Sequence, residues 1–443
     1  MLKSLVDKIG LDAITTTTLV TRVWTTFSGL VLLGAISYFL TPFEQGVYYL
    51  FVSMLAAQVL LELGLSFTLA QFTSHEFAYL SWSKQNFLEG DFDYVRKVLR
   101  FFKFALVWYF IIAVLMLLII FPVGIIFIGQ SNEEGIGTSV LTAWGVYVVV
   151  GALNMIVNPL LVLLEACGRV LEVAKIRLAQ AVLSTALILG VFYYGGGIFG
   201  LSAGLLGYVG IGVIWLTYSY SSFLKQALSL PLEMASVFKM VISMQWRIAI
   251  SWAFGYLTFY TFTPMVFYYV GGIESGQYGM SMQIFVALNS LGVAWITTKM
   301  PIFCKLIQLK KQDELNQRFY TALAQSSFVM VAINLLVLFI LGLDLNALAL
   351  ISSRILSWKL MALLCIASIL NHLIFSFAAI IRAQKIEPMM VPTVIGGLVM
   401  IISGWLFIPV YGAEGAVWIY LACTCLGFVM TLLIFKKHRK FVS

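Results

Sequence analysis

Long apolar runs alternate with short polar connections along the whole chain. Runs of about 20 residues are long enough for an α-helix to cross the roughly 30 Å hydrocarbon core of a bilayer. Strands of a membrane barrel would instead read as segments of about 10 residues with alternating hydrophobicity, which these runs lack. The pattern predicts an all-α polytopic membrane protein with about 12 transmembrane helices, near residues 16–40, 47–71, 101–129, 138–164, 174–196, 199–222, 241–271, 279–303, 319–343, 359–381, 388–409 and 413–435.

The composition supports the same class of protein. Hydrophobic residues make up 61% of the 443 residues, and charged residues make up 10%. A soluble globular protein carries roughly 25% charged residues, so that class is excluded. The first apolar run begins after residue 12 and lacks a basic start followed by a small-residue cleavage site. We therefore interpret it as a retained span rather than as a removed signal peptide.

The basic residues predict which connections face the cytoplasm. If both termini are cytoplasmic, the inner segments hold 22 of the 27 lysines and arginines, and the outer connections hold only Arg354 and Lys359. This asymmetry follows the positive-inside rule, and shifting the count by one span would destroy it. The net charge of +8 therefore lies mostly at the membrane surface. We interpret the basic KKHRK tail as an anchor for the last helix rather than as a nucleic-acid patch.

One short motif occurs twice, about half a chain apart. EQGVY at residues 44–48 follows the first predicted span, and ESGQY at 274–278 follows the seventh, with an offset of 230 residues. An arginine before each motif and a glycine-containing turn late in each half recur in the same order, at offsets of 225 and 212. These recurring features predict two repeats of six spans, 1–222 and 241–443, joined by a cytoplasmic linker at 223–240.

The predicted repeats have a consequence for architecture. Each half has an even number of spans, so both halves enter the membrane from the same side. Parallel repeats of this kind are related by an axis along the membrane normal, and transport sites typically lie between them. We therefore expect two pseudo-symmetric six-helix lobes around a central cavity.

Motifs of common catalytic and cofactor sites are absent from the sequence. There is no GxxxxGK[ST] phosphate loop, no HExxH and no cysteine–histidine cluster. The five cysteines lie in or beside apolar runs, where they are expected to be small packing residues. The outer connections are short and leave little room for a catalytic domain. We predict a protein that is not an enzyme, needs no cofactor or metal, and takes any energy from an ion gradient or from its substrate's own gradient.

The longest inner connection has a composition of its own. Residues 73–100 mix aromatic and charged side chains. This mixture predicts an amphipathic helix that lies on the membrane surface.

Two ionisable residues lie deep in predicted spans, where a charge costs about 2.5–3.5 kcal/mol on insertion scales. Glu62 forms a polar stripe with Gln58 and Ser66 at a spacing of four residues, on one helix face. His372 forms a second stripe with Ser368 and other small residues. Both are candidate ion-coupling residues, with Glu62 as the leading protonation site. The alternative is that each is a structural group hydrogen-bonded to a neighbouring helix.

Three basic residues lie near the ends of predicted spans. Arg22 and Arg247 occupy related positions in spans 1 and 7, each among small and polar residues, and Lys299 lies near the end of span 8. The arginine fork suits phosphate oxygens, so these residues predict a cationic vestibule for an anionic substrate. The alternative is that all three extend to the cytoplasmic interface and serve as anchors.

Several longer segments carry a family resemblance. The first half contains TRVWTTFSGL, PFEQGVYYLFVSM and ELGLSFTLAQF, and the second contains QWRIAISWAFGY, SGQYGMSMQIFVALNSLGVAWITTKMPIF and PVYGAEGAVWIY. Together they resemble the bacterial polysaccharide flippases, the O-antigen transporters of the multidrug/oligosaccharidyl-lipid/polysaccharide exporter superfamily. The resemblance covers nearly the whole chain and rests on the order and spacing of the segments.

The resemblance implies a twelve-helix, two-lobed carrier in the bacterial cytoplasmic (inner) membrane, working by alternating access. Its substrate would be an undecaprenyl-pyrophosphate-linked oligosaccharide, such as an O-antigen repeat unit for lipopolysaccharide, moved to the outer leaflet with cation coupling. Membrane lipids and other polysaccharide-assembly proteins would be its partners. Arg22, Arg247 and Lys299 match positions of the charged residues that line the cavity in that family.

Other functions stay open at this point. A cation-coupled multidrug exporter shares the fold, and in it Glu62 would bind a cationic drug or a proton. A membrane polysaccharide polymerase or ligase is disfavoured by the short outer loops. The related peptidoglycan-precursor flippases usually have fourteen spans, which disfavours that assignment.

Overall fold

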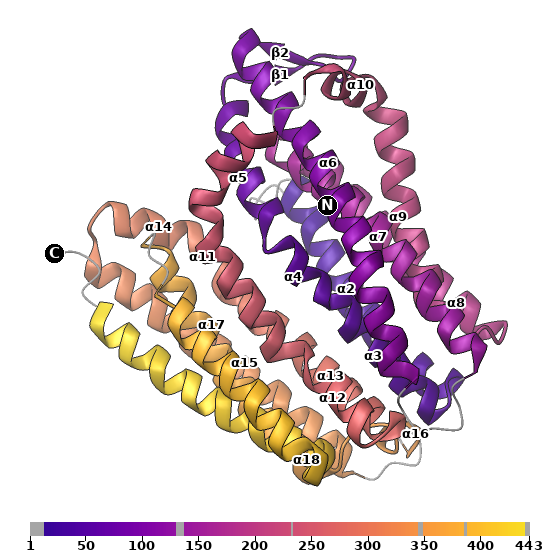
Figure 1. The fold of residues 1–443 in the computed structure, drawn as a ribbon. Helices are drawn as coiled ribbons and strands as arrows, with labels where there is room; N and C mark the ends of the chain where they lie inside the picture. The colour runs from indigo at the N-terminus through magenta and orange to yellow at the C-terminus, as the bar shows by residue number, and fades with distance from the viewer. Residues whose placement is uncertain (1–12, 130–136, 232–233, 344–348, 385–387, 439–443) are drawn as a thin grey trace, which may run out of the picture. The chain divides into compact units, whose positions relative to one another are not determined.

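The computed structural model describes residues 13–129, 137–231, 234–343, 349–384 and 388–438, which are almost entirely helical (Figure 1). Nine of the described helices are long and apolar enough to cross a membrane. One of them, α18 (Met390–His438), consists of two arms that meet at Gly412. Predicted span 1 corresponds to α2 (Ala13–Phe39), and predicted span 7 corresponds to α11 (Met234–Tyr260) with α12 (Phe262–Tyr269). Counted this way, the described helices correspond one by one to the twelve predicted spans. The prediction of an all-α polytopic membrane protein is confirmed.

The chain divides into two compact units. The first comprises Met1–Leu40 and Met54–Trp252, and the second comprises Thr41–Ser53 and Ala253–Ser443. The short segment Thr41–Ser53, which is early in the sequence, thus packs with the later helices.

The first unit is a helical bundle with a β-hairpin at one end, beside α10 (Figure 1). Within it, α6 packs on α7, α8 packs on α9, and α2 packs on α8. Its largest fully buried side chains include Trp144, Tyr109 and Phe102. The elements are α2, η1 (Ala56–Gln58), α4 (Val59–Glu62), α5 (Leu65–Phe77), β1 (Leu80–Trp82), β2 (Leu88–Gly90), α6 (Phe92–Gly129), α7 (Thr138–Ala166), α8 (Val170–Tyr193), α9 (Phe199–Ser219), α10 (Ser221–Ser229) and most of α11 (Met234–Tyr260).

Residues 73–100 do not form the amphipathic surface helix that the sequence predicts. Instead α5 ends at Phe77, and β1 pairs with β2 as an antiparallel hairpin in which Leu80 lies opposite Gly90. Asn86 in the turn has φ of 58°, and Gly90 has φ of 140°. Asn and Gly adopt such positive-φ conformations most readily, and a right-handed helix does not accommodate a positive φ. The prediction was wrong because the turn residues outweigh the amphipathic pattern.

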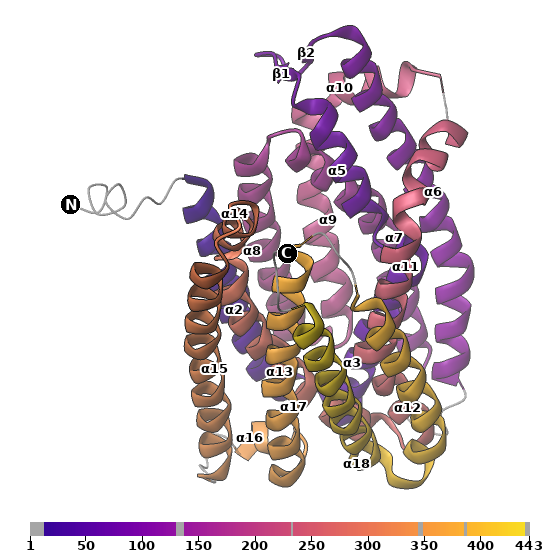
Figure 2. The same ribbon diagram turned by 90° about the vertical axis from the view of Figure 1, so that its left-hand side faces the viewer.

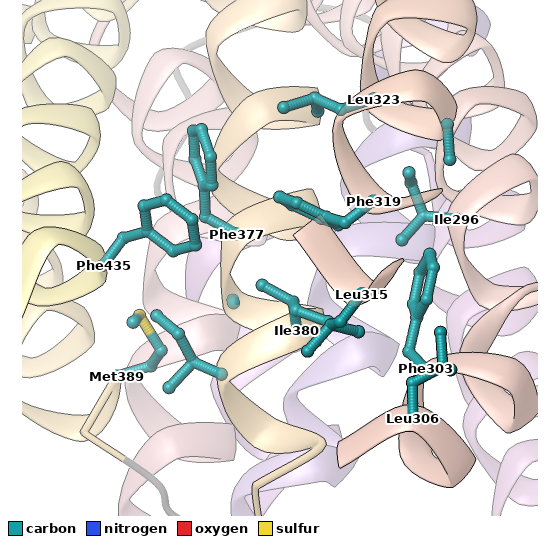
Figure 3. Close-up of a cluster of buried hydrophobic side chains, with 13 residues drawn as sticks. Ile296, Phe303, Leu306, Leu315, Phe319, Leu323, Phe377, Ile380, Met389 and Phe435 are labelled. Carbon is teal, nitrogen blue, oxygen red and sulfur yellow. The ribbon is translucent and has the colours of Figure 1, made fainter. Parts of the chain in front are cut away.

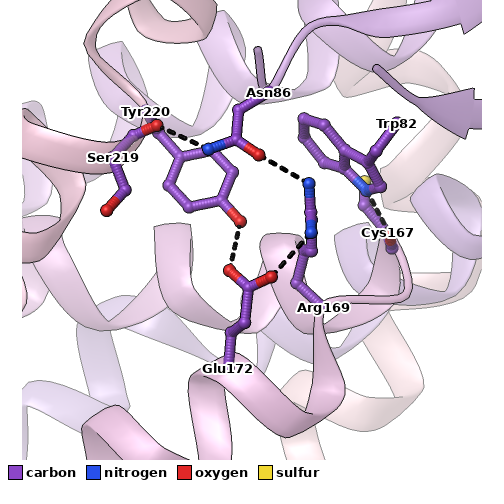
Figure 4. Close-up of polar contacts among 7 residues, drawn as sticks. All are labelled: Trp82, Asn86, Cys167, Arg169, Glu172, Ser219 and Tyr220. Atoms are coloured by element: carbon purple, nitrogen blue, oxygen red, sulfur yellow. Dashed lines mark hydrogen bonds and ion pairs between the residues drawn. The ribbon is translucent and has the colours of Figure 1, made fainter. Parts of the chain in front are cut away.

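Arg169 fastens this hairpin to the helices of the first unit (Figure 4). Its guanidinium lies 4.8 Å from the ring of Trp82, and it donates to Asn86 Oδ1 and to Glu172 Oε1, both at 2.6 Å. Tyr220 donates to the other oxygen of Glu172 at 2.8 Å. Burial raises the pKa of the Tyr220 phenol, so the hydroxyl stays protonated and keeps donating. The hairpin is therefore a fixed part of this unit.

The second unit contains the remaining helices, and Figure 2 shows α13, α15, α17 and α18 running side by side, in agreement with their packing contacts. Its elements are α3 (Pro42–Leu55), the end of α11, α12 (Phe262–Tyr269), α13 (Gly272–Thr297), α14 (Met300–Gln308), α15 (Gln312–Gly342), α16 (Ala349–Ser352), α17 (Trp358–Arg382) and α18.

Four phenylalanines from four helices form the centre of a buried cluster in the second unit (Figure 3). Phe303 lies on α14, Phe319 on α15, Phe377 on α17 and Phe435 on α18. The rings of Phe377 and Phe435 are 4.6 Å apart. Lipid tails are as apolar as these side chains, so the cluster stabilises the bundle through close van der Waals contact rather than through removal of water.

Candidate functional site

The second predicted span is broken in the middle. Helix α4 ends at Glu62, Leu63 and Gly64 both adopt left-handed backbone conformations, with φ of 53° and 74°, and α5 begins at Leu65. Glycine adopts this conformation readily, but leucine does so at a cost of about 1–3 kcal/mol. A break inside a span frees backbone carbonyls that hydrocarbon cannot satisfy, so they need a protein partner.

Gln245 of α11 supplies that partner. Its Nε2 donates to the backbone carbonyl of Leu63, and its Oε1 accepts from the hydroxyl of Thr68. Gln245 is only 5% exposed and Thr68 is fully buried. One side chain therefore joins both sides of the break to α11. Gln245 was not predicted from the sequence, because the only local signal of its role is a lone amide in an apolar run.

The Glu62 carboxylate lies at the break. Its Oε1 accepts from the hydroxyl of Ser66, and also from the hydroxyl of Tyr109 on α6 at 3.2 Å. The sequence predicted one continuous polar stripe of Gln58, Glu62 and Ser66, and the break interrupts that helix between Glu62 and Ser66, although these two side chains still form a hydrogen bond. Tyr109 was not anticipated because it comes from another helix. Glu62 is half-buried. A carboxylate held in this way inside an apolar span can take up a proton or a small cation.

His372 lies in a tightly packed environment on α17. It is fully buried, and its Nε2 lies 3.0 Å from the hydroxyl of Ser326 on α15. That hydroxyl also contacts the Leu323 carbonyl oxygen at 3.1 Å, so when it donates there its oxygen is available to accept from a protonated Nε2. Nδ1 is buried without a hydrogen-bond partner in the described structure, and a Cβ added at Gly292 would lie 2.7 Å from it. This geometry matches a packed, hydrogen-bonded histidine more closely than an accessible proton carrier.

The predicted basic residues are described to different extents. Arg22 lies on α2 and Arg247 on α11, but both side chains lie outside the described part of the structure. Lys299 lies between α13 and α14, and its Nζ donates to Oε1 of Gln325 on α15 at 3.3 Å. Gln325 precedes Ser326, so Lys299 and His372 contact consecutive positions of the same helix.

The repeated motif forms a helix–helix contact inside the second unit. A Cβ added at Gly276 of α13 would lie 2.8 Å from the backbone nitrogen of Gly46 on α3, and a Cβ at Gly279 would lie 2.5 Å from Cβ of Tyr49. Only glycine permits so close an approach of two helix backbones. The fully buried Gln45 side chain fastens the contact by donating to the Gly276 carbonyl at 2.9 Å.

The two glutamates of the repeated motif, Glu44 and Glu274, have different structural roles. Glu44 accepts from the backbone N–H of Thr41 at 2.8 Å, and the backbone N–H of Glu44 donates to the Thr41 hydroxyl at 3.2 Å, which is a capping box at the start of α3. The Glu274 carboxylate lies against Gly412, where an added Cβ would be 2.7 Å from Oε2. The glycine at the bend of α18 therefore makes room for the acid of the second motif.

Comparison of the sequence with protein-family models and with curated proteins finds no match. The fold, however, matches solved transporter structures. A multidrug resistance MATE family transporter of the MOP superfamily, in an inward-facing conformation, has a TM-score of 0.66 and 12% identity over 96% of both chains. The lipid II flippase MurJ, in an inward closed conformation, has a TM-score of 0.66 and 13% identity over 96% of this chain and 87% of that one. The MATE multidrug transporter DinF-BH has a TM-score of 0.56 and 15% identity over 97% of this chain and 96% of that one.

These likenesses extend over nearly the whole chain and establish its fold. The protein is a multi-pass membrane protein with the fold of the MOP superfamily transporters. The matched proteins are multidrug transporters and a lipid II flippase.

Proposed function

We propose that the protein is a flippase that moves undecaprenyl-pyrophosphate-linked oligosaccharide, a surface-polysaccharide repeat unit, across the bacterial cytoplasmic membrane by alternating access. The observation that carries the proposal is the fold, which the chain shares over 96% of its length with a lipid II flippase. A polar headgroup with a long apolar tail is the kind of substrate for which a flippase is needed, because the headgroup cannot cross hydrocarbon unaided.

The charge of the candidate site supports an anionic headgroup. Arg22 and Arg247 lie on α2 and α11, and a guanidinium fork binds phosphate oxygens through paired, charge-assisted hydrogen bonds. The described hydrogen bond of Lys299 goes to a neutral amide, which leaves its positive charge uncompensated by that contact. We propose that these three residues hold the pyrophosphate during transport.

Glu62 is the proposed coupling residue. Its carboxylate lies beside the break between α4 and α5, and Gln245 joins that break to the helix that carries Arg247. Discontinuous helices of this kind commonly form the ion sites of secondary transporters. His372 is a second candidate, but its buried and packed ring would have to move before Nδ1 could take a proton.

Multidrug export is the competing function, since the fold matches MATE transporters as well. The observation that favours it is Glu62, because a membrane-embedded carboxylate can bind an organic cation as readily as a proton. In this reading the substrate would be cationic, and the basic residues would be membrane anchors.

Deletion of the gene separates the two functions. The flippase proposal expects lipid-linked oligosaccharide to accumulate on the cytoplasmic leaflet and surface polysaccharide to disappear, with unchanged drug susceptibility. The Arg22→Ala/Arg247→Ala double variant should fail to restore the polysaccharide at wild-type protein level. Arg318→Ala is the matched control, since Arg318 makes an exposed ion pair with Glu314, and it should restore export. Increased drug susceptibility with normal polysaccharide would instead establish the exporter.

A further inference from the structure

The two arms of α18 line an open groove of about 700 Å³. On the first arm the lining residues recur every four positions from Val399 to Tyr411, and on the second arm they recur in the same way from Glu414 to Leu426. Residues at this spacing share one helix face, so the two faces are turned toward each other across the bend at Gly412. The lining residues are Val399, Ser403, Phe407, Tyr411, Glu414, Gly415, Trp418, Ile419, Ala422, Cys423 and Leu426.

The groove has small residues among large aromatic ones. Ser403, Gly415 and Ala422 leave space, while Phe407 and Trp418 are 47% and 52% exposed. An apolar hollow with exposed aromatic rings, on a helix pair that crosses the bilayer, lies open to lipid chains. The occupant that this environment selects is a hydrocarbon chain.

The length of the groove fits a chain from one leaflet. The face from Val399 to Tyr411 rises by about 18 Å at 1.5 Å per residue. Half of the hydrocarbon core of a bilayer is about 15 Å thick. The groove ends at the Gly412 bend, which the distribution of basic residues predicts to be on the outer side, so the chain would come from the outer leaflet.

The charge at the end of the groove selects the headgroup. Glu414 is exposed and lies two residues after the bend, and none of the described residues that line the groove is basic. A carboxylate at this position repels phosphate and pyrophosphate headgroups and attracts an ammonium group. Ethanolamine phospholipids carry a primary ammonium that can donate up to three hydrogen bonds to a carboxylate.

We propose that the α18 groove binds one acyl chain of an outer-leaflet ethanolamine phospholipid, with Glu414 accepting hydrogen bonds from the ammonium headgroup. This site is separate from the residues assigned to substrate and coupling, and it holds whether the transported molecule is a lipid-linked oligosaccharide or a drug.

Native mass spectrometry of the full-length protein tests the site. The protein is released from vesicles that contain equal amounts of phosphatidylethanolamine and phosphatidylglycerol with identical chains. We expect one retained phospholipid per chain, with ethanolamine preferred about two- to fivefold, the range that an exposed ion pair supports. Glu414→Gln should abolish the preference and leave the bound chain in place.

A second experiment fills the groove with a larger side chain. Ala422→Trp places an indole in the groove and should remove the retained lipid, whereas Cys425→Trp adds the same bulk to an exposed position outside the lining and should not. Equal lipid retention in Ala422→Trp and the wild type would overturn the site. No headgroup preference in the wild type, or a preference for an added polyprenyl phosphate, would overturn the assignment of its occupant.

Discussion

The contact between α3 and α13 allows a test of the proposed transport cycle. The two helices approach so closely at Gly46 that an added Cβ would lie 2.6 Å from the carbonyl carbon and 2.8 Å from the Cα of Gly272. If transport requires this contact to form and to separate, Gly46→Ala should favour the separated state. It changes one methyl group and introduces no charge.

The size of the effect follows from the geometry. Ordinary van der Waals contact begins at 3.4 Å, and the obstructing atoms at Gly272 belong to the backbone, so no change of rotamer relieves the overlap. The helices must move apart. Overpacking of this kind costs about 1–3 kcal/mol. A bias of that size shifts a two-state equilibrium by roughly 5- to 150-fold.

A buried thiol reports the separation. Met280 is fully buried and its sulfur lies 3.6 Å from Nε2 of Gln45, so Met280→Cys, in a variant without the five native cysteines, should react slowly with a membrane-impermeant maleimide. Adding Gly46→Ala should accelerate labelling and reduce transport. Gly34→Ala is the matched control, because none of the described neighbouring atoms lies within 4 Å of the added Cβ. Labelling and transport rates equal to those of the control would refute the role of this contact.

Three further predictions concern the first unit. Glu62→Gln should remove the pH dependence of transport, because the amide cannot take up a proton while it can still accept from Tyr109. Gln245→Leu leaves the Leu63 carbonyl without this partner and should lower the free energy of unfolding by about 1–3 kcal/mol, measured by thermal unfolding in detergent. Arg169→Lys loses the planar fork and the stacking on the hairpin, a loss of about 1–2 kcal/mol, and should make limited proteolysis of the hairpin roughly tenfold faster.

Each of these predictions has an outcome that contradicts it. A Glu62→Gln profile with the parent's pH dependence would exclude Glu62 as the coupling site. Gln245→Leu should be compared with Gln226→Leu, which changes an exposed glutamine, and equal melting temperatures would show that the bridge across the break contributes nothing. Arg318→Lys is the control for Arg169→Lys, and equal cleavage rates in the two would mean that the hairpin is held by other contacts.

The spacing of Glu62 and Ser66 in the sequence indicated that their side chains lie near each other, and they do form a hydrogen bond. The break between them was not predicted, because it depends on Gln245 of another helix. Tyr109 and Gln245 were not readable, because they come from helices 47 and 182 residues away from the groups they contact. Helical periodicity indicates which way a side chain faces on its own helix, and it does not indicate which helix lies opposite.

The chain by itself indicated the apolar spans and displayed the repeated motif. The bilayer demands about 20 apolar residues per helix, so the spans are a local property of composition and length, and the repeated motif is visible as a spacing. Only tertiary structure decided what that motif does. Gly46 and Gly276 meet because α3 packs with the second unit, and Gln45 bonds a carbonyl 231 residues away. Such contacts depend on how closely two distant backbones approach, a quantity that the order of residues does not specify.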